Sequence, residues 1–278
     1  MIHPIKSQWE CVLENIGEWT GSFTLLSPQG EQIEDITSLI TLISTGDNQA
    51  INLKLKRFYP LPGTTELYPK EIALNFSTPN PGSIFFETGA FSDGAISVSP
   101  GVKTITEFCL VGIDRRWRMV IVFNQAHQID KITLIREQRQ GTIAPERPIL
   151  TISDLLGTWQ GRSITSYPDD RPPITSETKS TFSVSNDGYQ WAENEESIDL
   201  KVTTTRRLEF QQASQSYQIL ILPDSSYSLT PTQITLGQPF YIEIGWIDQP
   251  GQRQRLVRRY DRNGAWESAT FIRESIDL

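Results

Sequence analysis

The chain carries the same short sequence pattern twice, and this internal repeat constrains its fold more than any other feature. Gly17–Gly21 reads GEWTG, and Gly157–Gly161 reads GTWQG. Near the end of each half, residues 118–137 align without gaps on residues 255–274, and both segments end in the triplet Ile-Arg-Glu. Two landmarks in the same order, at nearly the same separation, indicate two copies of one domain.

The seam between the copies follows from the breaks in the pattern. Gly141, Pro145 and Pro148 interrupt any regular element between the two halves. We therefore predict one domain over residues 1–140 and a second over residues 146–278.

Each copy begins with a short helical signal. Trp9, Val12, Leu13 and Ile16 recur at the spacing of one helix face. The preceding Ser-x-x-Glu sequence, which starts at Ser7, is a capping box. In the second copy, the residues just before Gly157 allow about one helical turn.

The rest of each copy is predicted to be β-strand. Apolar and polar residues alternate with period two in segments such as 51–56, 132–135 and 240–244. Turn-forming clusters are so frequent that eight or nine strands fit in each half. No connection has room for a crossover helix, so the strands should be antiparallel. A meander of this size closes into a barrel of about eight strands, which can hold one small ligand.

Charge and local sequence exclude several classes of protein. The chain of 278 residues has 25 basic and 33 acidic residues, and both halves are acidic. This balance is the opposite of what nucleic-acid binding requires, so we expect no nucleic-acid partner. The N-terminus has no signal-peptide pattern, and no apolar run is long enough to span a membrane. We therefore expect a cytoplasmic location.

The residues that usually carry metal or nucleophilic chemistry are scarce. There are two Cys and two His, with no HExxH or CxxC motif, so we expect no metal site. Cys11 and Cys109 should be free buried thiols. No GxSxG elbow and no glycine-rich phosphate loop is present, so no cofactor is expected either.

One helical turn, then Gly-x-Trp on the first strand and an Arg on the last strand, resembles the lipocalin (calycin) barrel. The resemblance implies that the first-strand Trp closes the barrel base and that the final-strand Arg packs across it. It therefore pairs Trp19 with Arg136, and Trp159 with Arg273, as structural residues. A guanidinium stacked on an indole is a favourable arrangement. Gly17 and Gly157 should be required because a Cβ there would clash with the closing strand.

The tandem form is similar to a cyanobacterial and plastid family of paired lipocalin-like domains of unestablished function. This resemblance covers essentially the whole chain and predicts an all-β fold of two tandem antiparallel barrels, each preceded by a short helix. The tail of the first half is also weakly similar to the lipocalin-like bilin lyases of phycobiliprotein assembly. No set of lyase residues can be transferred from that likeness.

The strongest candidates for binding chemistry lie on the penultimate strand of each copy. Arg116 and Arg118 share one face of this strand, opposite Trp117. In the second copy Arg258 replaces the apolar Ile121, on the side that we expect to face the barrel interior. A buried guanidinium must be paired or must meet an acidic ligand group, because an isolated buried charge is too costly.

These considerations predict a ligand site for an amphipathic molecule. Its candidate residues lie on strands near the end of each copy. They are Glu107, Trp117, Arg118, Arg258 and Tyr260. The alternative is that the arginines pair with cross-strand acids such as Glu243 and Asp248, and that the aromatic side chains simply fill the barrels.

Three functions remain open from the sequence. The first is intracellular binding of a small lipophilic or amphipathic ligand, for which the family resemblance favours a tetrapyrrole or an isoprenoid. The second is a lyase or isomerase in which Arg258 or Glu107 supplies electrostatic stabilisation. The third is a scaffold or assembly factor that binds a partner protein and holds no small ligand. The fold alone does not choose among them.

Overall fold

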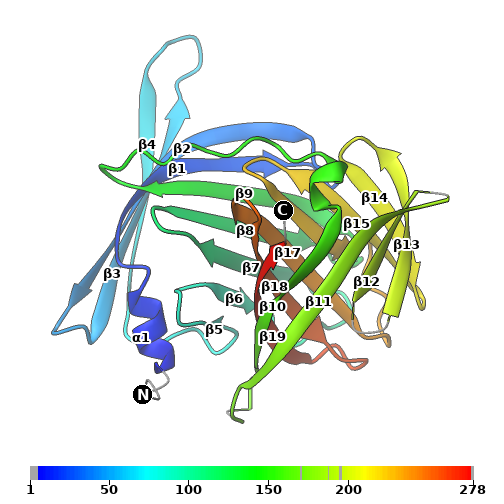
Figure 1. Cartoon of the computed structure of the whole chain (residues 1–278). Helices are drawn as coiled ribbons and strands as arrows, with labels where there is room; N and C mark the ends of the chain where they lie inside the picture. The colour runs from blue at the N-terminus through cyan, green and yellow to red at the C-terminus, as the bar shows by residue number, and fades with distance from the viewer. Residues whose placement is uncertain (1–5, 170, 187, 194–195, 277–278) are drawn as a thin grey trace.

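The computed structural model describes residues 6–169, 171–186, 188–193 and 196–276, and it contains two successive antiparallel β-structures (Figure 1). The predicted all-β, tandem fold class is confirmed. Residues 1–5, on which the expectation about a signal peptide rests, lie outside the described residues. No helix in the described part of the chain is long and apolar enough to cross a membrane.

The N-terminal half begins with helix α1 (Gln8–Leu13), whose predicted capping box between Ser7 and Glu10 is present. Nine strands follow, in the sheet order β4-β3-β2-β1-β9-β8-β7-β6-β5. Their bounds are β1 Gly17–Leu26, β2 Gln32–Thr45, β3 Ala50–Pro60, β4 Leu67–Phe76, β5 Ile84–Phe85, β6 Phe91–Gly94, β7 Thr104–Val111, β8 Arg115–Phe123 and β9 Ile129–Arg139.

The C-terminal half begins with a single 3-10 turn, η1 (Ile152–Leu155), and its ten strands form a closed barrel. The bounds are β10 Gly157–Ser166, β11 Ile174–Ser185, β12 Gly188–Glu193, β13 Glu196–Thr204, β14 Arg207–Gln212, β15 Gln215–Leu222, β16 Ser226–Pro231, β17 Phe240–Gln249, β18 Gln252–Tyr260 and β19 Trp266–Ile276.

The number of strands explains why only one half closes. Neighbouring strands are antiparallel throughout both halves, so the first and last of nine strands run in the same direction. An antiparallel ring needs an even number of strands, and β4 and β5 therefore cannot pair in that pattern. In the C-terminal half, β14 supplies the additional strand and pairs with both β13 and β15.

A proline-rich segment stands in the N-terminal half where β14 stands in the C-terminal half. The segment 77–83 joins β4 to β5 and contains Pro79, Pro81 and Gly82. Proline has no N–H to donate to a ladder, so this sequence cannot form an internal strand. The consequence is an open sheet in the N-terminal half.

The largest hydrophobic cluster lies between the two halves. It joins the outward faces of β7, β8 and β9 to those of β17, β18 and β19. Trp117 and Met119 from the first half and Trp246 and Leu256 from the second are all buried in it. Smaller clusters fill the interior of the C-terminal barrel and the space beneath α1. The two halves therefore share one core, in addition to a core of their own.

The second glycine of each repeat lets the first and last strands approach closely. A Cβ on Gly21 would lie 1.9 Å from the carbonyl oxygen of Arg136. A Cβ on Gly161 would lie 1.9 Å from the carbonyl oxygen of Arg273. Any side chain at either position would force the strands apart.

Both cysteines are free and buried, as predicted. Burial raises the pKa of Cys11 to about 11 and that of Cys109 to about 12. Neither thiol is activated as a nucleophile.

Candidate functional site

The floor of the C-terminal barrel is a tryptophan beneath a buried ion-pair network. The guanidinium of Arg253 lies 4.4 Å from the ring centroid of Trp159. Arg253 Nε and Arg255 Nε donate to the same Glu274 Oε2, at 2.9 and 3.1 Å. Arg253 Nη2 also donates to Ser180 Oγ at 2.8 Å. All these side chains are almost completely buried.

The N-terminal half repeats this floor. Arg116 lies 4.6 Å from the centroid of Trp19, and Arg139 lies 4.4 Å from it. Arg116 Nε donates to Glu137 Oε2 at 2.7 Å, and Arg118 Nη2 donates to Glu137 Oε1 at 2.9 Å. The floor of each half is therefore a tryptophan and two arginines that share one glutamate.

The predicted partners of the two indoles were wrong. Arg136 is paired in register with Ser22, and its guanidinium donates outward to Thr24 and Glu146. Arg273 is exposed. Side chains alternate along a strand, so the Ile-Arg-Glu triplet places its glutamate inside and its arginine outside. The arginines over the indoles come from β8, β9 and β18 instead.

Gly17 and Gly157 do meet the closing strand, as predicted. A Cβ on Gly17 would lie 2.5 Å from Arg139 Nη1, and one on Gly157 would lie 2.3 Å from Ile276 Cδ1. Both glycines also have positive φ, at +137° and +118°. Space and backbone conformation both favour glycine at these two positions.

The shared glutamates are held ionised by their arginines. Burial alone would raise the pKa of Glu137, but the charges of Arg116 and Arg118 outweigh it and lower the pKa. The pKa of Glu274 is lowered in the same way, with Arg255 and Arg253 outweighing the cost of burial. Each floor is therefore charged in the folded protein.

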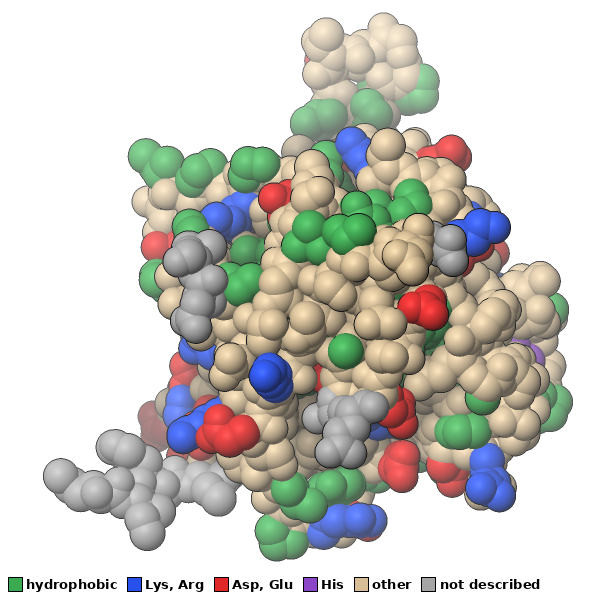
Figure 2. Space-filling model, turned by 45° about the vertical axis from the view of Figure 1, so that its right-hand side comes forward, with side chains coloured by type: hydrophobic (Ala, Val, Ile, Leu, Met, Phe, Trp, Pro, Cys, Tyr) green, Lys and Arg blue, Asp and Glu red, His purple; other side chains and the backbone are tan. Residues whose placement is uncertain are grey.

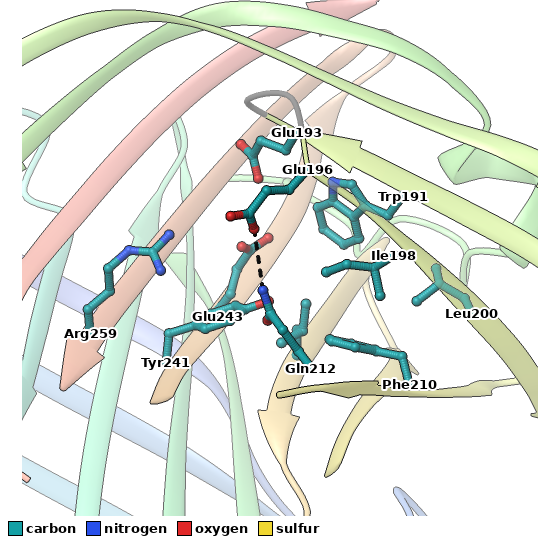
Figure 3. A pocket seen from close by; sticks show the side chains of 11 residues that line it. Trp191, Glu193, Glu196, Ile198, Leu200, Phe210, Gln212, Tyr241, Glu243 and Arg259 are labelled. Carbon is teal, nitrogen blue, oxygen red and sulfur yellow. Dashed lines mark hydrogen bonds between the residues drawn. The ribbon is translucent and has the colours of Figure 1, made fainter. Parts of the chain in front are cut away.

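Above the floor of the C-terminal barrel lies a cavity of about 260 Å³ with strongly acidic walls (Figure 3). The carboxylates of Glu193, Glu196 and Glu243 lie on one side of it, with Arg259 nearby. The apolar wall is formed by Trp191, Ile198, Leu200, Phe210 and Leu229.

Arg255 connects this cavity to the floor. Its Nη1 donates to both oxygens of Glu243 at 3.3 Å, and its Nη2 forms a short ion pair with Glu193. Tyr227 donates to Glu243 Oε1 at 3.0 Å. Burial raises the pKa of Glu243, although the charge of Arg255 opposes that effect. Pairing between the arginines and Glu243 was the alternative expected from the sequence, but the pair is buried, not solvated.

The N-terminal half holds a larger and more apolar cavity of about 510 Å³. Asn15, Glu107, Arg116 and Arg118 line its floor, and Thr78, Asn80, Ser83 and Asp93 line it elsewhere. Its walls are made by apolar side chains from six elements, among them Val12, Ile40, Leu42, Leu53, Leu74, Phe76, Phe85 and Phe91.

The strand registers identify the substitutions that separate the two interiors. Trp19 pairs with Ile40, whereas Trp159 pairs with Ser180. One strand further, Ile40 pairs with Leu55, whereas Ser180 pairs with Glu193. The N-terminal interior is therefore less polar at both positions.

Charge at the two floors differs as a result. On the other side of the indole, Trp19 pairs with Arg139 and Trp159 pairs with Ile276. The arginines of the N-terminal floor are Arg116, Arg118 and Arg139, and their acidic partners are Glu107 and Glu137. The arginines of the C-terminal floor are Arg253 and Arg255, and their acidic partners are Glu193, Glu243 and Glu274.

One buried nitrogen in the N-terminal floor has no partner among the described residues. Arg116 is 2% exposed and lines the cavity, and its Nη2 makes no hydrogen bond. The equivalent atom of Arg253 is bonded to Ser180. Ile40 stands where Ser180 stands and offers no oxygen. An unsatisfied buried donor is costly and marks this floor as the more receptive one.

The structure divides the five predicted ligand residues into two groups. Glu107 and Arg118 line the N-terminal cavity and form an ion pair at 2.8 Å. Trp117, Arg258 and Tyr260 line neither cavity and lie in the contact between the two halves. The alternation of faces was predicted correctly, but the face that we took as interior is the one that packs against the other half.

Arg258 illustrates the consequence. It is fully buried, and its guanidinium lies 3.8 Å from the centroid of Trp266. It donates to the carbonyl oxygens of Gly82 and Ala95 in the first half, at 3.0 and 3.1 Å. Burial lowers its pKa. Its hydrogen bonds fasten the halves together, which explains why it replaces the apolar Ile121.

Sequence reasoning missed the importance of Glu137 and Glu274. Both belong to the duplicated Ile-Arg-Glu triplet, so the repeat could have identified them. A glutamate next to an arginine in a strand is usually a surface residue, however, and these two are buried. No group of three or more His, Cys, Asp or Glu in the described ranges is arranged to hold a metal ion.

Two family models match the chain, one for each half. Residues 5–142 match the N-terminal part of DUF3598, a domain of unknown function. Residues 146–276 match the C-terminal domain of "Biogenesis factor required for ATP synthase 1". No curated protein matches the sequence.

The crystal structure of a DUF3598 protein of unknown function from Nostoc punctiforme is similar over nearly the whole chain. The two sequences are 34% identical, the match covers 98% of this chain and 100% of that one, and the TM-score is 0.89. This match confirms the predicted resemblance to a family of unestablished function.

Two further solved structures overlap only poorly. A mutant of transferrin binding protein B from Haemophilus parasuis is 8% identical, over 94% of this chain and 59% of that one, with a TM-score of 0.23. A putative AttH from Nitrosomonas europaea is 9% identical, over 93% and 91%, with a TM-score of 0.17. Neither overlap carries an argument.

Proposed function

The chain belongs to the DUF3598 family, and from that premise we propose that it is an assembly factor that binds a partner protein through its N-terminal half. The observation that carries the proposal is the match of the entire C-terminal barrel, residues 146–276, to a domain of a factor named for ATP synthase biogenesis. By analogy, the partner is a subunit of ATP synthase. We place this role in the cytoplasm.

The geometry supports a division of labour between the halves. The C-terminal barrel is closed, and its interior is crossed by the ion pairs of Arg255 with three glutamates. Such a network, together with the shared core, makes it a rigid support. The N-terminal sheet is open, and its β3–β4 hairpin projects at the top of the molecule (Figures 1 and 2). Leu61 and Leu67 near its tip are exposed.

A binding measurement tests the proposal. The purified full chain is mixed with each ATP synthase subunit in turn, and complexes are detected by size-exclusion chromatography with light scattering. We expect one subunit to form a stable complex. If none binds, and removing the gene leaves the amount of assembled ATP synthase unchanged, the proposal is wrong.

A second candidate function rests on the N-terminal cavity. Its volume of about 510 Å³, its apolar walls and the unpartnered Arg116 Nη2 suit a small amphipathic ligand with an acidic or carbonyl group. Ligand binding in this cavity would be lipocalin-like, and a tetrapyrrole or an isoprenoid fits the description.

A neutral fluorescent lipophile, 1-aminoanthracene, tests this second candidate. We expect its fluorescence to rise on binding and Leu53→Trp, which fills the cavity, to abolish the rise. The matched control is Ile113→Trp at an exposed turn. Unchanged fluorescence with the unaltered protein would contradict a ligand role.

A further inference from the structure

The outer edge of β4 is an unpaired template for another strand. β4 extends over ten residues, Leu67–Phe76, and among the described strands it pairs only with β3. An edge of this length presents a row of free N–H and C=O groups to any extended chain. Natural proteins usually cover or block such an edge, so a long free one calls for an explanation.

The C-terminal half shows what covers the corresponding strand. There β14 pairs with β13 and directs Leu208 and Phe210 into the barrel, where both are buried. Phe210 also lines the C-terminal cavity. Because β4 and β5 run in the same direction, one antiparallel strand between them would restore the even number that closes a barrel. No described segment of the chain supplies such a strand to the N-terminal half.

Pro69 identifies which part of the edge is available. Proline is tolerated within a sheet where its missing N–H faces the free edge, and β4 passes through Pro69 without a bulge. Alternate residues direct their backbone groups to the same side. The free donors are therefore the N–H groups of Glu71, Ala73 and Asn75, whereas the edge at Pro69 is blocked.

The inward face beside these donors is apolar and partly uncovered. Ile72 is 43% exposed and Leu74 is 56% exposed, although both lie on the inner face of the sheet. Leu74 and Phe76 also line the large cavity. Apolar side chains at alternate positions of an added strand would cover Ile72 and Leu74 and reach into the cavity, as Phe210 does in the other half.

The charge of the hairpin selects the partner. Strands β3 and β4 with their turn carry Lys54, Lys56, Arg57 and Lys70, against Glu66 and Glu71 only. This excess of positive charge occurs in a chain of formal charge −8. Only Lys56 has an acidic partner on the hairpin, Glu71 at 3.4 Å. An added segment is therefore favoured if it carries acidic side chains.

We propose that the edge of β4 from Glu71 to Phe76 binds an extended segment of the partner protein, with large apolar residues at alternate positions and acidic residues between them. Main-chain hydrogen bonds to Glu71, Ala73 and Asn75 provide affinity, and the apolar side chains enter the N-terminal cavity to provide specificity. The inference rests on the proposed partner-binding function and names the segment that the partner contributes.

The test begins without assuming a partner sequence. A phage-displayed library of random decapeptides is selected on the immobilised full chain, and the affinity of the selected peptides is measured by fluorescence anisotropy. We expect a consensus that alternates apolar and acidic residues. Selected peptides should slow hydrogen exchange at Glu71, Ala73 and Asn75.

Variants at the edge test the location. Ala73→Pro removes one free donor and should weaken peptide binding about tenfold, whereas Ala73→Val, the matched control, keeps the donor and should not. Leu74→Gln and Lys54→Glu, which reverses the charge opposite Ala73 on the outer face, should each weaken binding by a similar factor. Ile113→Gln, at an apolar residue 80% exposed on another turn, should leave it unchanged. Circular dichroism verifies that each variant is folded.

The outcomes separate this inference from the proposed function. If an ATP synthase subunit binds but the β4 variants do not weaken it, the inference fails and the assembly role stands. If no decapeptide is selected, or if selected peptides are insensitive to Ala73→Pro and Leu74→Gln, the inference is overturned. If instead 1-aminoanthracene binding alone responds to Leu74→Gln, the cavity belongs to a small molecule.

Discussion

The two halves of this chain share a floor and differ in their walls. Both floors place a tryptophan beneath an arginine and let two arginines share one buried glutamate. One half is closed by ten strands and has an acidic interior, and the other is an open sheet of nine with an apolar cavity. The comparison teaches that the floor fixes the fold of each copy, whereas the wall is free to diverge.

The largest expected effect tests whether the floors are equivalent. Glu137→Ala and Glu274→Ala each leave two buried guanidinium groups without their shared acceptor, so each should lower the free energy of unfolding by about 3–5 kcal/mol. Urea denaturation measures both. Glu177→Ala, which breaks the exposed pair with Arg162, is the control and should cost less than about 1 kcal/mol. If either variant loses less than about 1 kcal/mol of unfolding free energy, the two floors are not equivalent in stability.

The next effect distinguishes a closed wall from an open one. Gly21→Ala and Gly161→Ala each place a methyl group against the carbonyl oxygen of the last strand. Overpacking of this kind costs about 1–3 kcal/mol. We expect the larger loss at Gly161, because a closed barrel cannot relax by separating β10 from β19. Thermal unfolding of the two variants compares them, and equal losses would show that closure adds no rigidity.

A smaller effect follows from the unpartnered Nη2 of Arg116. Ser180→Ala removes the acceptor of Arg253 Nη2 and should cost about 1–2 kcal/mol. Ile40→Thr places a hydroxyl at the equivalent position and should recover part of its packing cost through a bond to Arg116. Ile40→Val, which shortens the side chain without adding a hydroxyl, is its matched control. If the Ile40→Thr protein is less stable than the Ile40→Val protein, Arg116 Nη2 does not lack an acceptor at this position.

The smallest effect is a pH dependence confined to the C-terminal half. Burial raises the pKa of Glu243 in the folded protein, so the folded state binds a proton more readily than the unfolded state. The resulting stabilisation is present below the ordinary glutamate pKa and is lost as the pH rises through the raised value. We expect stability, relative to Glu243→Gln, to increase from pH 7 to pH 5. Urea midpoints at both pH values measure this, and a constant difference would contradict it.

The repeat made the tandem fold predictable, because two copies of a landmark need no structural information to be recognised. The open edge of the N-terminal sheet was not predicted, because the effect of Pro79 and Pro81 on closure depends on the sheet order. The domain limits 1–140 and 146–278, as separately folding units, stay a prediction. The shared core makes their independence a question for experiment.

The candidate site was predictable only in part. Arg118 and Glu107 line the N-terminal cavity, although the alternation, read with the Trp117 face as interior, would have directed Arg118 outward. Which face is interior could not be read, since Trp117 and Arg258 lie on a strand face covered by the other half. An apolar strand face that packs against another domain has the same sequence pattern as one that lines a barrel interior, so the sequence alone does not distinguish them. The pairing of the indoles with Arg136 and Arg273 came from the lipocalin resemblance, which does not specify which arginine of the last strands faces the indole.

The shared core has a consequence for either copy taken alone. A single copy of the repeat would leave the outward faces of its last three strands, with residues such as Trp117 and Met119, uncovered in water. Such a copy would have to dimerise to cover this apolar surface. Linking both copies in one chain makes the same burial intramolecular and therefore independent of protein concentration.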